Sequence, residues 1–304
     1  MSADFLKLSD CGSNDLQHLI KETLRLKNTT SDEKPLKGKS IGMIFTKSST
    51  RTRIGFELGM YQLGGYAMQL RSDEIQLGRG ESLEDTAKIM SRYLDGLAVR
   101  TDEHKMVEDL AEAASIPIIN ALTDKYHPCQ AVADYATLLE HKKSLENIKL
   151  AYVGDGNNVA HSLITGAALL GIEACIASPE GYGPDSDVIA TAREIGGATG
   201  AKLTLTDDPK VAADSADAVY TDVWVSMGQE NEAVSRREAF NGYYIDDNLM
   251  KLAKKDCVAM HCLPAHRGEE IAASVIDGPQ SIVFDQAENK LHAQKAILKM
   301  VLGG

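Results

Sequence analysis

The sequence predicts an α/β protein with two doubly wound parallel-sheet domains that are linked by interdomain helices. Its 304 residues are about twice the common length of one domain. Short apolar runs alternate with segments of helical periodicity, a pattern typical of strands joined by helical crossovers into a parallel sheet. A polar break at Lys142-Lys143-Ser144 separates two series of such units. The length, the alternation and the break together indicate two domains of one class.

The first half of the chain is predicted to contain an opening helix and then alternating strands and helices. Apolar residues at helical spacing follow Ser13 and Asn14, whose side chains commonly cap helix N-termini, so the chain opens with an amphipathic helix. Apolar runs predict strands at residues 41–45, 66–70, 97–100 and 116–119. Helices are predicted between them at residues 52–63, 82–93 and 104–114.

The second half repeats this rhythm after a predicted helix at residues 131–141. Strands are predicted at residues 149–153, 174–177, 202–205, 218–221, 258–261 and 281–284, with helical segments between most of them. We therefore assign residues 1–142 to a first domain and residues 143–285 to a second. The last helical segment, residues 286–304, is long enough to pack back onto the first domain.

The charge and cysteine content disfavour several classes of protein. The chain has 32 Lys and Arg against 44 Asp and Glu, a formal net charge of -12, so we expect no nucleic-acid partner and no membrane surface. Any anion site must be local. The five cysteines contain no CxxC pair, which disfavours a disulfide framework and favours a reducing compartment. The acidic N-terminus lacks an apolar signal region, so we expect a soluble, cytoplasmic protein.

Polar motifs lie at or after the ends of predicted strands. Ligands bind at the carboxyl ends of strands in open parallel sheets, because loops and helix N-termini converge there. The motifs of the first half are Lys47-Ser48-Ser49-Thr50-Arg51-Thr52-Arg53, Arg100 and His127-Pro128-Cys129-Gln130. Those of the second half are Gly154-Asp155-Gly156-Asn157-Asn158, Asp222-Val223-Trp224 with Ser226-Met227-Gly228, and His261-Cys262-Leu263-Pro264.

The motif at residues 47–53 has the chemistry of an anion site. It combines hydroxyl groups with Arg51 and Arg53 at a predicted helix N-terminus, whose N–H groups and dipole favour an anion. Arginine adds a planar donor fork that matches phosphate oxygens. The simpler interpretation is a helix cap with solvated arginines, and the motif alone leaves both open. It is not a Walker A loop, because the chain contains no GxxxxGK[ST].

The glycine motif after residue 153 resembles a dinucleotide loop only in part, because Val159 stands at the third glycine position. We interpret it as a turn that lets Asn157 or Asn158 offer an amide to a small substrate, with turn chemistry alone as the simpler interpretation. His127 is compatible with a helix cap or with a group that polarises a carbonyl. Asp222 is compatible with a turn cap or with a partner for a substrate ammonium.

Cys262 and its neighbouring histidines raise the question of a metal or cysteine-nucleophile site. A buried cysteine at a strand end is the simpler interpretation. His261, Cys262 and His266 have no second ligand cluster that would complete a tetrahedral site, so we expect no metal. A cysteine protease with His127 as its base finds no local support in the sequence.

The motifs resemble, in order and along nearly the whole chain, those of the aspartate/ornithine carbamoyltransferase family. Ser49-Thr50-Arg51-Thr52-Arg53 is similar to the family's carbamoyl phosphate motif, and residues 127–130 are similar to its HPxQ motif. Residues 222–230 and 261–264 are similar to segments of the ornithine branch. The STRTR segment is shared with the aspartate branch, whereas SMG together with HCLP is far more specific.

The resemblance implies two sets of binding residues. Carbamoyl phosphate would be bound by Ser49, Thr50, Arg51, Thr52, Gln76, Arg100, His127, Gln130, Cys262, Leu263 and Lys290. Ornithine would be bound by Asn158, Asp222, Ser226 and Met227. The resemblance also implies a homotrimer in which Gln76 enters a neighbouring site. Lys290 stands where the family usually has arginine; lysine keeps the charge but loses the bidentate fork, so we expect weaker or rearranged binding there and retained activity.

The implied reaction is transfer of the carbamoyl group from carbamoyl phosphate to the side-chain amine of L-ornithine, in arginine metabolism, without a metal or organic cofactor. Residues 1–142 would bind the donor and residues 143–285 the acceptor. The catalytic residues would be Arg100, His127, Asp222 and Cys262. Three alternatives remain: a related transferase acting on putrescine or an acylated ornithine, a silent binding protein that senses an anionic metabolite, and a nicotinamide oxidoreductase.

Overall fold

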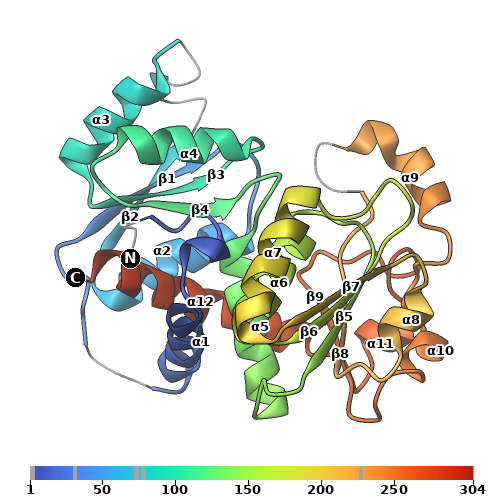
Figure 1. Ribbon diagram of the computed structural model, residues 1–304. Helices are drawn as coiled ribbons and strands as arrows, with labels where there is room; N and C mark the ends of the chain where they lie inside the picture. The colour runs from blue at the N-terminus through green and yellow to red at the C-terminus, as the bar shows by residue number, and fades with distance from the viewer. Residues whose placement is uncertain (1–3, 30–32, 72–74, 77–79, 226–228, 304) are drawn as a thin grey trace. The chain divides into compact units, whose positions relative to one another are not determined.

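The computed structural model describes residues 4–29, 33–71, 75–76, 80–225 and 229–303. It forms two compact units, one comprising Met1–Ala136 with Glu288–Gly304 and the other comprising Thr137–Ala287 (Figure 1). The chain passes between the units within helix α5 (Pro128–Lys142) and again within helix α12 (Val283–Leu302). Each unit is built around its own parallel sheet, which confirms the predicted fold class.

The first unit contains a four-stranded parallel sheet with strand order β2-β1-β3-β4. Its strands are β1 (Ser40–Phe45), β2 (Tyr66–Arg71), β3 (Gly96–Arg100) and β4 (Ile118–Leu122). Besides the parts of α5 and α12, its helices are η1 (Leu8–Asp10), α1 (Ser13–Asn28), α2 (Arg51–Leu63), α3 (Leu83–Tyr93) and α4 (His104–Ala113). In Figure 1, α3 and α4 cover one face of this sheet, and α1, α2 and α12 lie on the other.

Strand β4 begins two residues later than predicted, because Pro117 has no N–H to donate to a strand ladder. The Pro117 carbonyl still accepts the Leu97 N–H at 3.0 Å, and the first regular pairing joins Leu97 to Ile118. The register between β3 and β4 then shifts between Val99 and Arg100. Such an irregularity changes the direction of the side chains at a strand end, where Arg100 lies.

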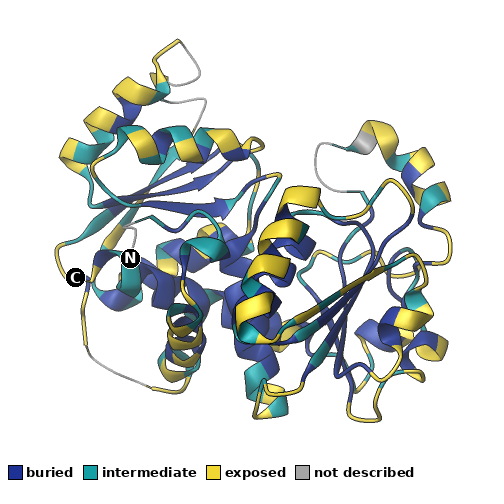
Figure 2. Ribbon diagram, in the orientation of Figure 1, coloured by how far each residue is buried: buried dark blue, intermediate teal, exposed yellow. Residues whose placement is uncertain are grey.

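The second unit contains a five-stranded parallel sheet with strand order β7-β6-β5-β8-β9. Its strands are β5 (Lys149–Val153), β6 (Glu173–Ala177), β7 (Lys202–Thr206), β8 (Ala218–Thr221) and β9 (Val258–His261). Its helices are α6 (Asn158–Leu170), α7 (Ser186–Thr199), α8 (Pro209–Ala213), η3 (Glu230–Glu232), α9 (Ala233–Ala239), α10 (Asp247–Met250) and α11 (Ala273–Ile276). Figure 2 shows that the central strands of both sheets are buried, whereas exposed residues lie along the outer faces of α3 and α7.

The strand predicted at residues 281–284 is wrong. Ser281 makes only an isolated bridge to Ala259, the Ile282 N–H donates to the Ala259 carbonyl at 3.1 Å, and α12 begins at Val283. The apolar run is explained by burial at a helix start, because Ile282 and Val283 are buried whereas Phe284 is 70% exposed. A short apolar run does not distinguish a strand from the first turn of a buried helix.

The ion pair of Glu22 with Lys299 attaches α1 to the C-terminal end of α12 within the first unit, and Arg25 on α1 pairs with the same carboxylate. The Glu22 carboxylate accepts hydrogen bonds from Arg25 at 2.7 and 2.8 Å and from Lys299 Nζ at 2.8 Å. The hydrogen bond from Arg25, followed by that from Lys299, lowers the pKa of Glu22 to about 2. A carboxyl whose folded-state pKa is depressed stabilises the fold above its unfolded pKa, and this stabilisation is lost as the pH falls through the folded value.

We therefore expect Glu22→Gln to lower the free energy of unfolding by about 1 kcal/mol at pH 7, with the difference from wild type disappearing between about pH 4.5 and pH 2. Urea unfolding at several pH values measures this difference. Glu84→Gln is the matched control, because Glu84 is 66% exposed and pairs with Lys88, which is 57% exposed. A pH-independent loss in the Glu22 variant would contradict the electrostatic explanation.

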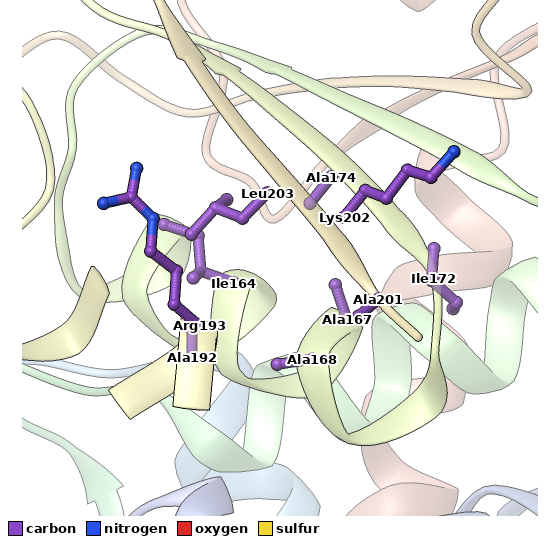
Figure 3. A pocket seen from close by; sticks show the side chains of 10 residues that line it. All are labelled: Ile164, Ala167, Ala168, Ile172, Ala174, Ala192, Arg193, Ala201, Lys202 and Leu203. Atoms are coloured by element: carbon purple, nitrogen blue, oxygen red, sulfur yellow. The ribbon is translucent and has the colours of Figure 1, made fainter. Parts of the chain in front are cut away.

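A small cavity of about 80 Å³ lies in the second unit between α6, α7 and the strands β6 and β7. Figure 3 shows that small alanine side chains, with Ile164, Ile172 and Leu203, make up much of its lining. A gap in a core forfeits the dispersion contacts that a larger side chain would make. It is therefore a position where the fold can gain stability.

We expect Ala192→Met, which extends a flexible apolar side chain from α7 toward this cavity, to stabilise the protein by about 1 kcal/mol. The thermal unfolding midpoint measures the effect. Ala190→Met is the matched control, because Ala190 lies on the same helix but is exposed, and it should change the midpoint little. An equal change in both variants would show that helix propensity, and not cavity filling, is responsible.

Candidate functional site

The loop after β1 and the start of α2 form a cationic site in the first unit. Thr50 precedes α2 and its side chain makes no capping hydrogen bond, and the first turn of the helix holds no acidic residue. The helix N-terminus therefore offers its N–H groups and the positive end of its dipole to an anion. Ser49, Thr50, Arg51 and Thr52, which were predicted to bind a phosphate, all lie at this point.

Arg100 brings a buried positive charge to the same loop from the end of β3. It is 6% exposed, and its Nη1 donates to Ser49 Oγ at 3.4 Å. Its Nε has no hydrogen-bond partner among the residues that the structure describes. Burial lowers the pKa of Arg100, and the positive charge of Arg51 lowers that pKa further. A buried cation beside another cation is costly unless an anion compensates it, so the site is suited to an anionic ligand.

His127 and Lys290 form a buried pair in the first unit, in which Lys290 brings a further positive charge. His127 precedes α5 and Lys290 lies on α12; they are 4% and 5% exposed, and His127 Nε2 lies 3.2 Å from Lys290 Nζ. An ammonium can only donate, so Nε2 accepts. Burial, and then the charges of Lys290, Arg100 and Arg51, lower the pKa of His127 well below its usual value. His127 is therefore a neutral imidazole within a cationic cluster.

Gln130 lies one helical turn after His127 and is held by its own helix. It is 2% exposed, and its Nε2 donates to Asp134 Oδ1 at 2.8 Å. Its Oε1 has no hydrogen-bond partner within the described part of the chain. The amide therefore has a fixed orientation and an oxygen that remains available to accept a hydrogen bond.

Asp222 and Cys262 meet at the carboxyl ends of β8 and β9 in the second unit. The Cys262 thiol donates to Asp222 Oδ1 at 2.9 Å, and the Val223 N–H donates to the same oxygen at 2.8 Å. Asn157 Nδ2 donates to Asp222 Oδ2 at 2.8 Å, so both carboxylate oxygens are held. Asp222 is 6% exposed, and Cys262 is half-buried. This arrangement is a fixed carboxylate–thiol pair suited to an amine ligand.

The comparisons with known proteins identify the family. Residues 3–140 match the sequence model described as aspartate/ornithine carbamoyltransferase, carbamoyl-P binding domain. Residues 146–301 match that described as aspartate/ornithine carbamoyltransferase, Asp/Orn binding domain. The chain belongs to the aspartate/ornithine carbamoyltransferase family.

Relatives within the family match the whole chain. It is 53% identical to the ornithine carbamoyltransferase of Halalkalibacterium halodurans, over 99% of this chain and 95% of the relative. It is 51% identical to that of Thermococcus kodakarensis, over 99% of this chain and 96% of the relative. The solved structure of ornithine carbamoyltransferase from Pyrococcus furiosus matches with a TM-score of 0.95 and 48% identity, over 99% of this chain and 97% of that one.

Four further residues were predicted for the site. Ser226 and Met227 lie outside the residues that the structure describes. Gln76 is exposed between β2 and α3, and its backbone carbonyl accepts the Glu81 N–H at 3.2 Å. Asn158 is the first residue of α6, and its carbonyl accepts the Ser162 hydroxyl at 2.9 Å. The side chain that reaches Asp222 is that of the preceding residue, Asn157.

Sequence reasoning missed an ion pair near the second cluster. Arg236 on α9 donates from Nη1 to Asp155 Oδ2 at 2.9 Å and to the Trp224 carbonyl at 3.0 Å. Burial raises the pKa of Asp155 to about 6, although the charge of Arg236 opposes this rise. The sequence carries no signal for the pair, because its partners are separated by 81 residues.

Two groups of potential metal ligands occur among the described residues, but hydrogen bonds within the protein occupy several of their atoms. The first group is Asp222, His261 and Cys262, and the second is His266, Glu269 and Glu270. In the first group, His261 Nδ1 accepts the Leu263 N–H at 2.9 Å, and the Cys262 thiol donates to Asp222.

None of the described helices combines the length and the apolar character that crossing a bilayer requires.

Proposed function

We propose that this chain transfers the carbamoyl group from carbamoyl phosphate to the side-chain amine of L-ornithine, giving L-citrulline and phosphate, as part of arginine metabolism. The observation that carries this proposal is the identity of 51–53% with relatives named ornithine carbamoyltransferase over 99% of the chain. The cationic cluster and the carboxylate–thiol pair support it, because one suits a phosphorylated donor and the other suits an amine. The same relatives and the same two clusters favour this transferase over a silent binding protein or a nicotinamide oxidoreductase.

For the donor, we infer that Ser49, Thr50, Arg51 and Thr52 bind the phosphate through hydroxyl groups, a guanidinium and helix N–H groups. Arg100, His127 and Gln130 would bind the carbamoyl group. The buried Arg100 and the cationic surroundings of His127 support this role, because negative charge develops on the carbonyl oxygen in the tetrahedral transition state. Lys290 would add a positive charge beside His127, without the bidentate fork that arginine offers.

For the acceptor, we infer that Asp222 binds the ornithine side-chain amine, with Asn158, Ser226 and Met227 as further contacts. An alkyl amine has a pKa near 10.4, so it is largely protonated at pH 7 and must lose a proton before it can attack. Asp222 would orient the ammonium and, with Cys262, help to remove that proton. The thiol–carboxylate hydrogen bond at 2.9 Å supports this assignment. Cys262 and Leu263 would also lie near the reacting carbamoyl group.

The domain roles follow from these assignments. We propose that residues 1–142, together with the last helical segment at residues 286–304, form the carbamoyl phosphate-binding domain, and that residues 143–285 form the ornithine-binding domain. The matched regions, described as carbamoyl-P binding at residues 3–140 and Asp/Orn binding at residues 146–301, support this division.

We also propose a cytoplasmic location, which the five free cysteines favour because thiols persist in a reducing compartment.

We propose a homotrimer in which Gln76 enters the site of a neighbouring subunit. An apolar surface on the first unit supports an assembly: Ile54, Leu58 and Tyr61 are 53%, 37% and 75% exposed at helical spacing on α2. Tyr66 and Met68 on the edge strand β2 are also exposed, at 61% and 42%. Exposed apolar side chains that share a surface are typical of protein interfaces. Sedimentation equilibrium measures the assembly, and a monomer at micromolar concentration would overturn it.

A colorimetric citrulline assay tests the proposed function, with ornithine, putrescine and N-acetylornithine compared as acceptors at a fixed concentration of carbamoyl phosphate. We expect turnover with ornithine and little with the other two amines. Turnover of putrescine or N-acetylornithine alone would show a related transferase. The absence of any carbamoylated product, in a preparation that binds carbamoyl phosphate, would favour a binding protein.

A further inference from the structure

A buried pair, His261 and Glu270, lies beneath the loop that carries Cys262. Both side chains are 0% exposed, and His261 Nε2 lies 3.1 Å from Glu270 Oε1. His261 Nδ1 accepts the Leu263 N–H at 2.9 Å. A ring nitrogen that accepts a hydrogen bond carries no proton, so the ring proton is on Nε2 and is donated to Glu270. The two hydrogen bonds therefore fix both the tautomer and the orientation of the ring.

The same pair holds the loop at its other end. Glu270 Oε1 also accepts the His266 N–H at 2.6 Å, so residues 263 and 266 are both attached to the pair. Leu263, the first of these two residues, has φ of 57°, in the left-handed region. That conformation costs a residue with a side chain about 1 kcal/mol or more, so it persists only where the surroundings hold it.

Stability alone does not account for this arrangement. Glu270 Oε2 is buried and has no hydrogen-bond partner among the described residues. A buried carboxylate oxygen without a partner is a cost to folding, and an apolar pair of similar volume would avoid it. The hydrogen bonds instead fix the path of residues 262–266. Directly after His261, this path places the Cys262 thiol 2.9 Å from Asp222 Oδ1.

We propose that His261 and Glu270 are positioning residues for the carbamoyl transfer: through the loop at residues 262–266 they hold the Cys262 thiol on the Asp222 carboxylate. The expected kinetic effect rests on the proposed function, whereas the expected geometry rests on the hydrogen bonds alone. Neither side chain touches substrate; each acts through Leu263 and His266. Removal of the pair is expected to release Cys262 while the sheet is retained.

The rate of alkylation of Cys262 tests the geometry without reference to activity. The other four cysteines are buried, so iodoacetamide labelling followed by peptide mass spectrometry reports mainly on Cys262. Glu270→Met preserves side-chain volume but removes the acceptor, and we expect alkylation about 10-fold faster than in wild type, because the thiol loses its fixed partner. Glu270→Gln is the matched control: it keeps an acceptor oxygen and should alkylate near the wild-type rate.

Steady-state kinetics test the consequence for the reaction. We expect Glu270→Met to lower kcat for citrulline formation about 10- to 100-fold, since small misplacements of a site residue have effects of this size. The KM for carbamoyl phosphate should change much less, because its phosphate is assigned to residues 49–52. The control variant Glu270→Gln should retain most of the wild-type kcat. Thermal unfolding of each variant identifies any general loss of structure.

A second variant keeps the test decisive if Glu270→Met does not fold. His261→Gln keeps a donor near Glu270 but removes the acceptor for the Leu263 N–H, and we again expect alkylation about 10-fold faster. Wild-type alkylation rates in a folded variant would overturn the proposed geometry. Faster alkylation with unchanged kcat would overturn the link to catalysis. Wild-type protein that makes no citrulline would refute the proposed function, while the alkylation comparison would still test the pair.

Discussion

Arg51→Ala is expected to lower kcat/KM for carbamoyl phosphate about 1000-fold while the protein remains folded. Arg51 opens α2 at a helix N-terminus without acidic residues, and its charge acts on both Arg100 and His127. Loss of its guanidinium removes a charge-assisted donor for the phosphate and reduces the stabilisation of charge in the transition state. Isothermal titration calorimetry with carbamoyl phosphate, together with the citrulline assay, measures both effects.

Arg53→Ala is the control for this result. Arg53 lies on the same helix two residues later, but it is 48% exposed and pairs with Glu57 through a hydrogen bond of 2.9 Å. Exposed pairs of this kind contribute little, so donor affinity should stay within about twofold of wild type. Unchanged donor affinity in the Arg51 variant, or equal losses in the two variants, would overturn the assignment of the phosphate site.

The fold was predictable because its central strands are buried on both faces and therefore read as short apolar runs, whereas the edge strands β2 and β7 carry exposed residues. Each of the nine strands among the described residues was predicted within three residues at both boundaries. The errors have local physical causes. Pro117 delays β4 because it lacks an N–H, and residues 281–284 were misassigned because Val283 is buried in a helix. Burial, and not backbone conformation, is what an apolar run reports.

The candidate site was predictable only where its residues are consecutive in the chain. The motif at residues 47–53 and the segment at residues 261–264 carry recognisable combinations of polar groups after strands. The pair of Arg236 with Asp155 and that of Glu270 with His261 depend on contacts that the folded backbone creates. No periodicity or spacing marks such partners, because a single buried carboxylate has the same appearance in the sequence as an exposed one. The register of β8 and β9, which sets Thr221 beside His261, brings Asp222 and Cys262 together.

Asp222→Asn is expected to lower kcat for citrulline formation about 100- to 1000-fold and to raise the KM for ornithine. The amide preserves the shape of the side chain but removes the negative charge that orients an ammonium and accepts its proton, a contribution of about this size for general acid–base catalysis. It also presents an N–H₂ group to the amide of Asn157 or to the thiol of Cys262, where the carboxylate accepts hydrogen bonds at 2.8 and 2.9 Å. Steady-state kinetics with ornithine as the varied substrate measure both changes.

Donor binding separates this prediction from a general loss of structure. The cations assigned to carbamoyl phosphate belong to the first unit and Asp222 to the second, so calorimetric affinity for carbamoyl phosphate alone should change by less than about threefold in the Asp222 variant. Asp214→Asn, which alters an exposed carboxylate after α8, should leave both kinetic constants unchanged. If Asp222→Asn weakened donor and acceptor binding equally, Asp222 would be acting on the stability of the whole protein, because an amine-binding carboxylate affects the acceptor alone.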